Sequence, residues 1–192
     1  MSVEADVADR AEVPFAGALQ VPWTLRSAHP QVRTGQPADH ASVTVVTGGW
    51  VRVGVHAIGG LTDVGFAPDS QLLLVLGHQG RGVFHCQTGR RVARNSLDDW
   101  SYFSRESGTA MGIGPLEGQP IAIAGLMSGR SLPTSSGGCN ARVTPTGIHL
   151  RSSPTEEQTI AEREDLRVFG FAPNGETFVV GTPSDISLYR RA

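Results

Sequence analysis

The chain has 192 residues and a net charge of −2, so it lacks the basic footprint of a protein that binds nucleic acid. All 16 basic residues are arginine, which excludes chemistry that needs a Schiff-base lysine or a phosphate-loop lysine. The 24 glycines and 12 prolines favour many short strands over helices.

The first 42 residues are predicted to form an irregular arm. Prolines interrupt this segment, and it is acidic where a signal peptide is basic. The longest apolar runs, residues 72–76 and 121–127, are far shorter than the roughly 20 residues of a membrane span. We therefore expect a cytoplasmic protein with no membrane partner. Two cysteines, Cys86 and Cys139, are expected to be reduced and to pack as small apolar side chains.

Residues 43–192 are predicted to form a single β-repeat domain. Residues 42–56, "SVTVVTGGWVRVGVH", alternate apolar and polar side chains around a Gly-Gly pair, which predicts an antiparallel hairpin. Residues 61–94 contain apolar segments of about five residues separated by turn formers, which predicts three or four strands in a meander. The run 72–76 does not alternate, so we expect it to be buried on both faces of its sheet.

The second half of the chain predicts more strands and one helix. After a polar connection come a strand group at residues 111–127, a loop rich in small residues at 128–140 and a hairpin at 141–152. Residues 153–165, "SPTEEQTIAERED", are the one predicted helix, with Thr155 as its N-cap and a length of at most two or three turns. The last segment, 165–191, returns to alternating strands and turns.

One five-residue phrase occurs twice, as "FAPDS" at residues 66–70 and as "FAPNG" at 171–175, 105 positions later. Each copy places a proline turn between an aromatic residue and an apolar strand. Residues 61–94 resemble a blade of a degenerate WD-type β-propeller repeat, in which Phe84-His85 stand in place of the Trp-Asp pair. Residues 165–191 resemble a second copy of this blade. The resemblance implies an all-β, mainly antiparallel fold.

The length of the chain limits how such blades can be arranged. Propeller blades have about 40 to 45 residues and closed rings use four or more. The chain therefore has room for three blades, or for four if residues 42–56 are recruited. We expect either a partial or irregular propeller or a two-layer sheet assembly, with one short helix.

Catalytic motifs are absent from the sequence. The glycines of "GIGPLEG" have the wrong spacing for a dinucleotide fingerprint and precede a predicted strand instead of a helix. His85 and Cys86 are neighbours on a predicted strand, so their side chains leave opposite faces. No pair among the six histidines has metal-ligand spacing. We expect no metal and no cofactor.

The segment "LDDWSYF" is the strongest binding candidate. It combines Asp98, Asp99, Trp100 and Tyr102 in a connection, a composition enriched at protein interfaces. The plainer alternative is that the aromatic rings pack beneath the sheets while the acids face water. Arg105 and Arg130 are further binding candidates, Arg130 in the loop rich in small residues.

Two classes of function follow from these features. The first is a non-catalytic module that binds a protein partner, such as a bacterial immunity or antitoxin-type inhibitor or another accessory protein. The second is a hydrolase-like enzyme with a dispersed site, in which Asp98 or Asp99 acts with a histidine from another strand. The sequence predicts no oligomeric state.

Overall fold

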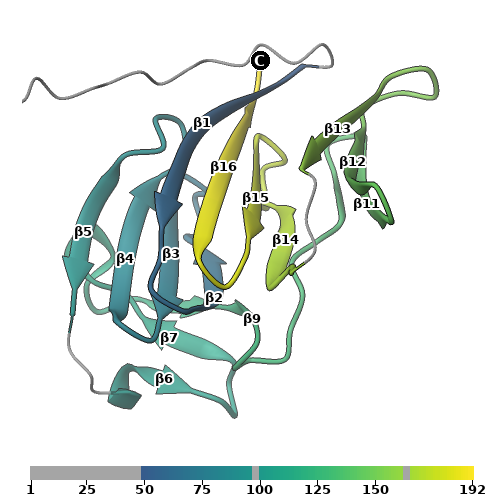
Figure 1. Ribbon diagram of the computed structural model, residues 1–192. Helices are drawn as coiled ribbons and strands as arrows, with labels where there is room; N and C mark the ends of the chain where they lie inside the picture. Colours follow the sequence, from purple (N-terminus) through teal and green to yellow (C-terminus); the bar gives the residue numbers. More distant parts are fainter. Residues whose placement is uncertain (1–48, 97–99, 162–164) are drawn as a thin grey trace, which may run out of the picture. The chain divides into compact units, whose positions relative to one another are not determined.

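Four antiparallel sheets make up the part of the chain that the computed structural model describes, residues 49–96, 100–161 and 165–192 (Figure 1). The strands of the central sheet are β2 (Leu61–Phe66), β3 (Leu72–Gly77), β4 (Gly80–His85), β5 (Arg91–Asn95) and β9 (Ala124–Gly125). The strands of the C-terminal sheet are β1 (Trp50–Ala57), β14 (Val168–Phe171), β15 (Thr177–Gly181) and β16 (Asp185–Arg191). The predicted all-β, mainly antiparallel fold is confirmed.

The other two sheets are smaller. The small sheet contains β6 (Phe103–Ser104), β7 (Thr109–Met111) and β8 (Pro120–Ala122). The polar sheet contains β10 (Ser135–Ser136), β11 (Cys139–Thr144), β12 (Gly147–Arg151) and β13 (Glu157–Ala161). Two single turns of 3-10 helix, η1 (Trp100–Tyr102) and η2 (Gly114–Leu116), lie in the connections.

Three apolar cores lie between the sheets and order them as a stack. The first lies between the small and central sheets, the second between the central and C-terminal sheets, and the third between the C-terminal and polar sheets. Side chains of β3 alternate between two of these cores: Leu74 and Leu76 face the small sheet, whereas Leu73 and Val75 face the C-terminal sheet. All four are at most 1% exposed, so the predicted burial of β3 on both faces is confirmed. Each such side chain stabilises the fold by roughly 2 kcal/mol through burial.

The central and C-terminal sheets are two copies of one unit. Residues of β2, β3 and β4 correspond to those of β14, β15 and β16 at a constant offset of 105, and the strand register is the same in both. Gly65 pairs with Leu74 as Gly170 pairs with Val179. Each glycine lies where another segment crosses its strand, since a Cβ on Gly65 would come within 2.3 Å of the Ala122 carbonyl oxygen.

The repeated phrase forms the same turn in both copies. The amide of Ser70 donates to the Ala67 carbonyl, and the amide of Gly175 donates to the Ala172 carbonyl. The third turn residue, Asp69 or Asn174, accepts a hydrogen bond from the amide two residues later in each copy, both at 3.0 Å. Ser70 has φ +60° and Gly175 has φ +74°, a left-handed conformation that glycine adopts without strain.

The two sheets stack in the same direction. The face of the central sheet that carries Leu73 packs on the C-terminal sheet, and the equivalent face, which carries Phe178, packs on the polar sheet. The two proline turns follow the same order of sheets. Ser70 of the central sheet contacts the backbone at Asn174 of the C-terminal sheet, while a Cβ on Gly175 would meet Ser136 in the polar sheet. Residues 111–152, predicted as a strand group, a loop and a hairpin, divide among the small sheet, the central sheet through β9, and the polar sheet. Over the described residues the stack does not close into a ring, because no core joins the small sheet to the polar sheet.

The fourth strand of the C-terminal sheet comes from the start of the described chain. In the central sheet this place belongs to β5, which follows β4 directly, whereas β16 pairs with β1 (Figure 1). Residues 50–57, which overlap the predicted hairpin, thus supply the fourth strand of the C-terminal sheet. The first strand of the predicted hairpin lies outside the described residues, as does the predicted arm.

The predicted helix at residues 153–165 is wrong. Residues 157–161 form β13, which pairs with β12, and no α-helix occurs in the described parts of the chain. Gln158 and Ile160 turn toward the C-terminal sheet while Glu157 and Thr159 are exposed, a period of two that outweighs the helix propensity of the segment. Instead of a helix cap at Thr155, Ser153 Oγ accepts a hydrogen bond from the Glu156 amide in a turn.

The described residues contain no helix that is long and apolar enough to cross a membrane.

Candidate binding surface and polar network

Aromatic and cationic side chains gather where the β3–β4 turn meets η1. The Trp100 ring stacks on the Tyr102 ring with centroids 5.8 Å apart and an angle of 26° between the planes. The Arg81 guanidinium carbon lies 4.2 Å from the centroid of the Tyr102 ring, on its face. The imidazole of His78 meets Trp100 edge to face at 6.4 Å. We call these four residues, together with Met111, the aromatic–arginine surface.

Local structure fixes these side chains. Tyr102 is 8% exposed and belongs to the core between the small and central sheets, so its ring is a rigid base. An Arg81 Nη1 N–H donates to the carbonyl oxygen of Met111 in β7, which holds the guanidinium in place. Trp100 and Met111 remain 37% and 39% exposed. The surface therefore presents two large apolar side chains beside a positioned cation.

The sequence-predicted site residues separate into three groups. Asp98 and Asp99 lie outside the described residues. Trp100 and Tyr102 do lie together, Trp100 exposed as the interface hypothesis requires and Tyr102 buried as the alternative requires.

Arg105 and Arg130 belong to another part of the surface, and both are exposed. A Cβ on Gly108 would come within 2.4 Å of the Arg130 guanidinium, so Arg130 lies over the β6–β7 turn that carries Arg105.

His78 and Arg81 were not predicted as site residues. His78 lies in the β3–β4 turn, among the turn formers of the predicted meander, but the ring that Arg81 covers comes from a segment 21 residues later. The contact depends on how the small sheet packs against the central sheet. The alternation of β4, which places Arg81 on the face opposite Gly82, is the only sequence signal that points toward it.

A buried carboxylate shapes the predicted binding loop. Asp63 is 0% exposed, and its two carboxylate oxygens accept hydrogen bonds from the amides of Met127 and Ser128 at 3.0 and 2.9 Å. Gly125 faces Asp63 in the β2–β9 pair, where a Cβ would lie 2.3 Å from the Thr62 carbonyl oxygen. Asp63 therefore holds the loop against the central sheet, and its role is structural.

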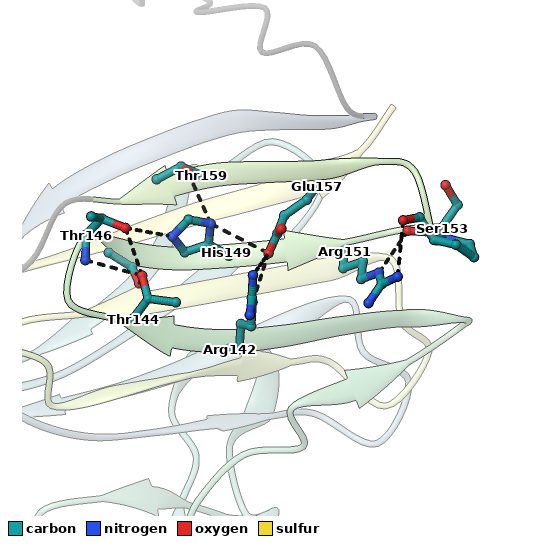
Figure 2. A network of polar contacts seen from close by, with 10 residues as sticks. Arg142, Thr144, Thr146, His149, Arg151, Ser153, Glu157 and Thr159 are labelled. Atoms are coloured by element: carbon teal, nitrogen blue, oxygen red, sulfur yellow. Dashed lines mark hydrogen bonds and ion pairs between the residues drawn. The ribbon is translucent and has the colours of Figure 1, made fainter.

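The outer face of the polar sheet carries a polar network (Figure 2). The Nε2 atom of His149 lies 3.1 Å from the Thr146 hydroxyl, and its Nδ1 atom lies 3.6 Å from Oε1 of Glu157. A hydroxyl, an imidazole and a carboxylate thus follow one another in the order that nucleophilic hydrolases use.

The geometry of this network favours a structural role. The Arg142 side chain donates to Oε1 of Glu157 from Nε at 2.9 Å and from Nη2 at 2.8 Å, so this oxygen is already engaged. The Nδ1 atom of His149 lies closer to the Thr159 hydroxyl, at 3.3 Å, than to Glu157. Thr146 is exposed in the β11–β12 turn. We interpret the network as the polar outer surface that ends the stack, as terminal units of repeat proteins have.

Comparison of the chain with protein-family models and with curated proteins finds no match. Across the described residues, no three histidine, cysteine, aspartate or glutamate side chains converge closely enough to hold a metal ion.

Proposed function

We propose that the chain is a non-catalytic protein-binding module whose partner docks on the aromatic–arginine surface. The observation that carries this proposal is the environment of Trp100, which is 37% exposed although Tyr102 and His78 hold its ring on two sides. A ring already fixed in place loses little conformational freedom when a partner covers it. Tryptophan, tyrosine and arginine are the residue types that dominate binding energy at protein interfaces.

The chemistry of the surface defines the partner segment. Trp100 and Met111 offer apolar area, and Arg81 offers a cation whose position is fixed by Tyr102 and by the Met111 carbonyl. A segment that combines an apolar side chain with a carboxylate is complementary to this arrangement. An immunity or antitoxin-type inhibitor is one form of this function, in which the partner is an enzyme or toxin that the chain inactivates.

Capture from the native cell tests the proposal. The full chain, Trp100→Ala and Val143→Ala are used as bait, since Val143 is 49% exposed on the polar sheet, away from the aromatic–arginine surface. We expect one stoichiometric protein with the wild type and with Val143→Ala, and its loss with Trp100→Ala. A partner that Trp100→Ala retains contradicts the proposal. Loss of the partner's activity when the purified chain is added supports the inhibitor form.

An enzyme is the second candidate, because His78 lies beside Trp100, the residue that follows Asp99 in the sequence. In this case the chain captures no partner, and Asp99→Asn abolishes a turnover that the wild type shows.

A further inference from the structure

A hollow of about 340 Å³ opens on the central sheet beside β4 and the edge strand β5. Its floor contains Val75, Gly82 and Phe84, and Ile58 of the β1–β2 connection forms part of its wall. Arg91 and Arg94 of β5 lie at its side. The hollow is therefore apolar below and cationic at one edge.

The strand register explains why this space is empty. Gly82 pairs with Arg94, and Phe84 pairs with Arg91, since a β-bulge shifts the register between Val83 and Phe84. Directly paired residues lie on one face of a sheet, as do residues two apart on one strand. The side chains of both arginines therefore project from one face of the sheet, the face on which Gly82 leaves a gap. A Cβ on Gly82 would lie 3.7 Å from Cδ of Arg91, so this side chain passes over the gap.

The charge of the hollow is unbalanced. Arg91 and Arg94 contribute their side chains to it, whereas the Arg81 side chain leaves the other face of the sheet toward Tyr102. The lining of the hollow contains no aspartate or glutamate. Within residues 49–96, 100–161 and 165–192, neither Arg91 nor Arg94 forms a hydrogen bond or an ion pair through its guanidinium. Arginines without an internal acid partner attract anions, and their planar donors match carboxylate and phosphate oxygens.

We propose that this hollow binds a small organic anion with an apolar body and a phosphate or carboxylate group. Arg91 and Arg94 pair with Phe84 and Gly82, which are two residues apart on β4 and therefore separated by roughly 7 Å, so the two long side chains can reach one oxyanion from two sides. The apolar body of the ligand rests over Gly82 against Val75 and Phe84. This site is distinct from the aromatic–arginine surface, and the inference does not rest on the protein-binding role.

Calorimetry with phenyl phosphate tests the site on the full chain. This probe is largely dianionic at neutral pH and carries an apolar ring. Inorganic phosphate tests the contribution of the ring, and benzyl alcohol tests that of the charge. The variants are Arg91→Ala and Arg94→Ala, with Arg52→Ala as the control, because Arg52 is an exposed β1 residue outside the lining of the hollow. Thermal unfolding of each variant shows that it is folded.

We expect saturable binding of phenyl phosphate to the wild type and to Arg52→Ala. Arg91→Ala and Arg94→Ala should each weaken the binding of phenyl phosphate about tenfold or more, as expected when one charged hydrogen-bonding partner is removed. Inorganic phosphate should bind more weakly than phenyl phosphate, and benzyl alcohol should not bind measurably. The absence of saturable binding overturns the proposal, as does an affinity of Arg91→Ala and Arg94→Ala that equals that of the wild type. Equal affinity for inorganic phosphate overturns the assignment to an organic ligand.

Discussion

The backbone amide of Asn174 donates a hydrogen bond to the Ser70 hydroxyl, 3.3 Å away, and so joins the turn of one repeat to the same turn of the next. Ser70 is 3% exposed, and the equivalent position of the second copy is a glycine, Gly175. A single side chain thus connects two sheets that the sequence separates by 105 residues.

Two substitutions of Ser70 distinguish the contribution of its hydroxyl to stability from that of its left-handed backbone conformation. Ser70→Ala loses the bond to Asn174 and keeps the left-handed φ, so we expect the free energy of unfolding to fall by about 1 kcal/mol. Ser70→Gly loses the same bond but adopts φ +60° without strain, so it should lie closer to the wild type. Urea unfolding measures both variants. Equal stability of Ser70→Ala and the wild type would show that the bond contributes nothing.

Replacing Gly65 tests whether β8 approaches the central sheet closely. In Gly65→Ala the new Cβ would lie 2.3 Å from the Ala122 carbonyl oxygen, so backbone must move, and we expect a loss of about 3 kcal/mol or more. Gly82→Ala is the matched control in the same sheet, where the nearest atom is 3.3 Å away on the Phe84 ring. Chemical denaturation should show a loss below about 1 kcal/mol for this control. Similar losses in both variants would contradict the crossing geometry.

Asp63 is expected to control the loop at residues 125–130. Asp63→Ala leaves the amides of Met127 and Ser128 without their acceptors, so we expect destabilisation by about 2 to 3 kcal/mol and faster trypsin cleavage after Arg130. Asp69→Asn is the control, because Asn174 makes the equivalent hydrogen bond in the second repeat. This control should match the wild type in both assays. Unchanged cleavage in Asp63→Ala would argue against the anchoring role.

Cys86 gives the fold a predicted dependence on pH. Burial raises the pKa of its thiol to about 12. Between pH 9 and 12 the folded state keeps a proton that the unfolded state releases, so stability should fall as pH rises above about 9. The slope from this group approaches about 1.4 kcal/mol per pH unit.

The comparison with Cys86→Ala isolates this effect. The difference in free energy of unfolding between wild type and variant should shrink as pH rises from 9 to 11, since the variant lacks the group that titrates. A difference that stays constant with pH would contradict the assignment. Folded wild-type protein should also react slowly with thiol reagents at Cys86, which is 1% exposed.

The two proline turns and the burial of β3 could be predicted from sequence because their signals are local. Proline, aspartate and asparagine in the repeated turn specify its backbone, and five uninterrupted apolar residues in β3 require cover on both faces. Strand β13 could not be predicted in this way. Its glutamate, glutamine and alanine have helical propensity, and only pairing with β12 makes it extended.

The candidate site was predictable only in part. Composition pointed to Trp100, since an exposed tryptophan beside acids is typical of interfaces. Arg81 and His78 join it through packing between two sheets, and the anion-binding hollow depends on a β-bulge that brings Arg91 opposite Phe84. Neither arrangement has a signature within a single segment of the chain.

The affinity of the purified partner for Trp100→Ala, compared with Val143→Ala, tests the protein-binding role most directly. Calorimetric titration of both variants gives this comparison, with circular dichroism to show that they share the wild-type fold. We predict that Trp100→Ala binds about 30-fold more weakly or worse, as loss of about 2 kcal/mol from an interface hot spot implies, while Val143→Ala binds as the wild type does. Equal affinity of the two variants would contradict the assignment of the aromatic–arginine surface as the docking site.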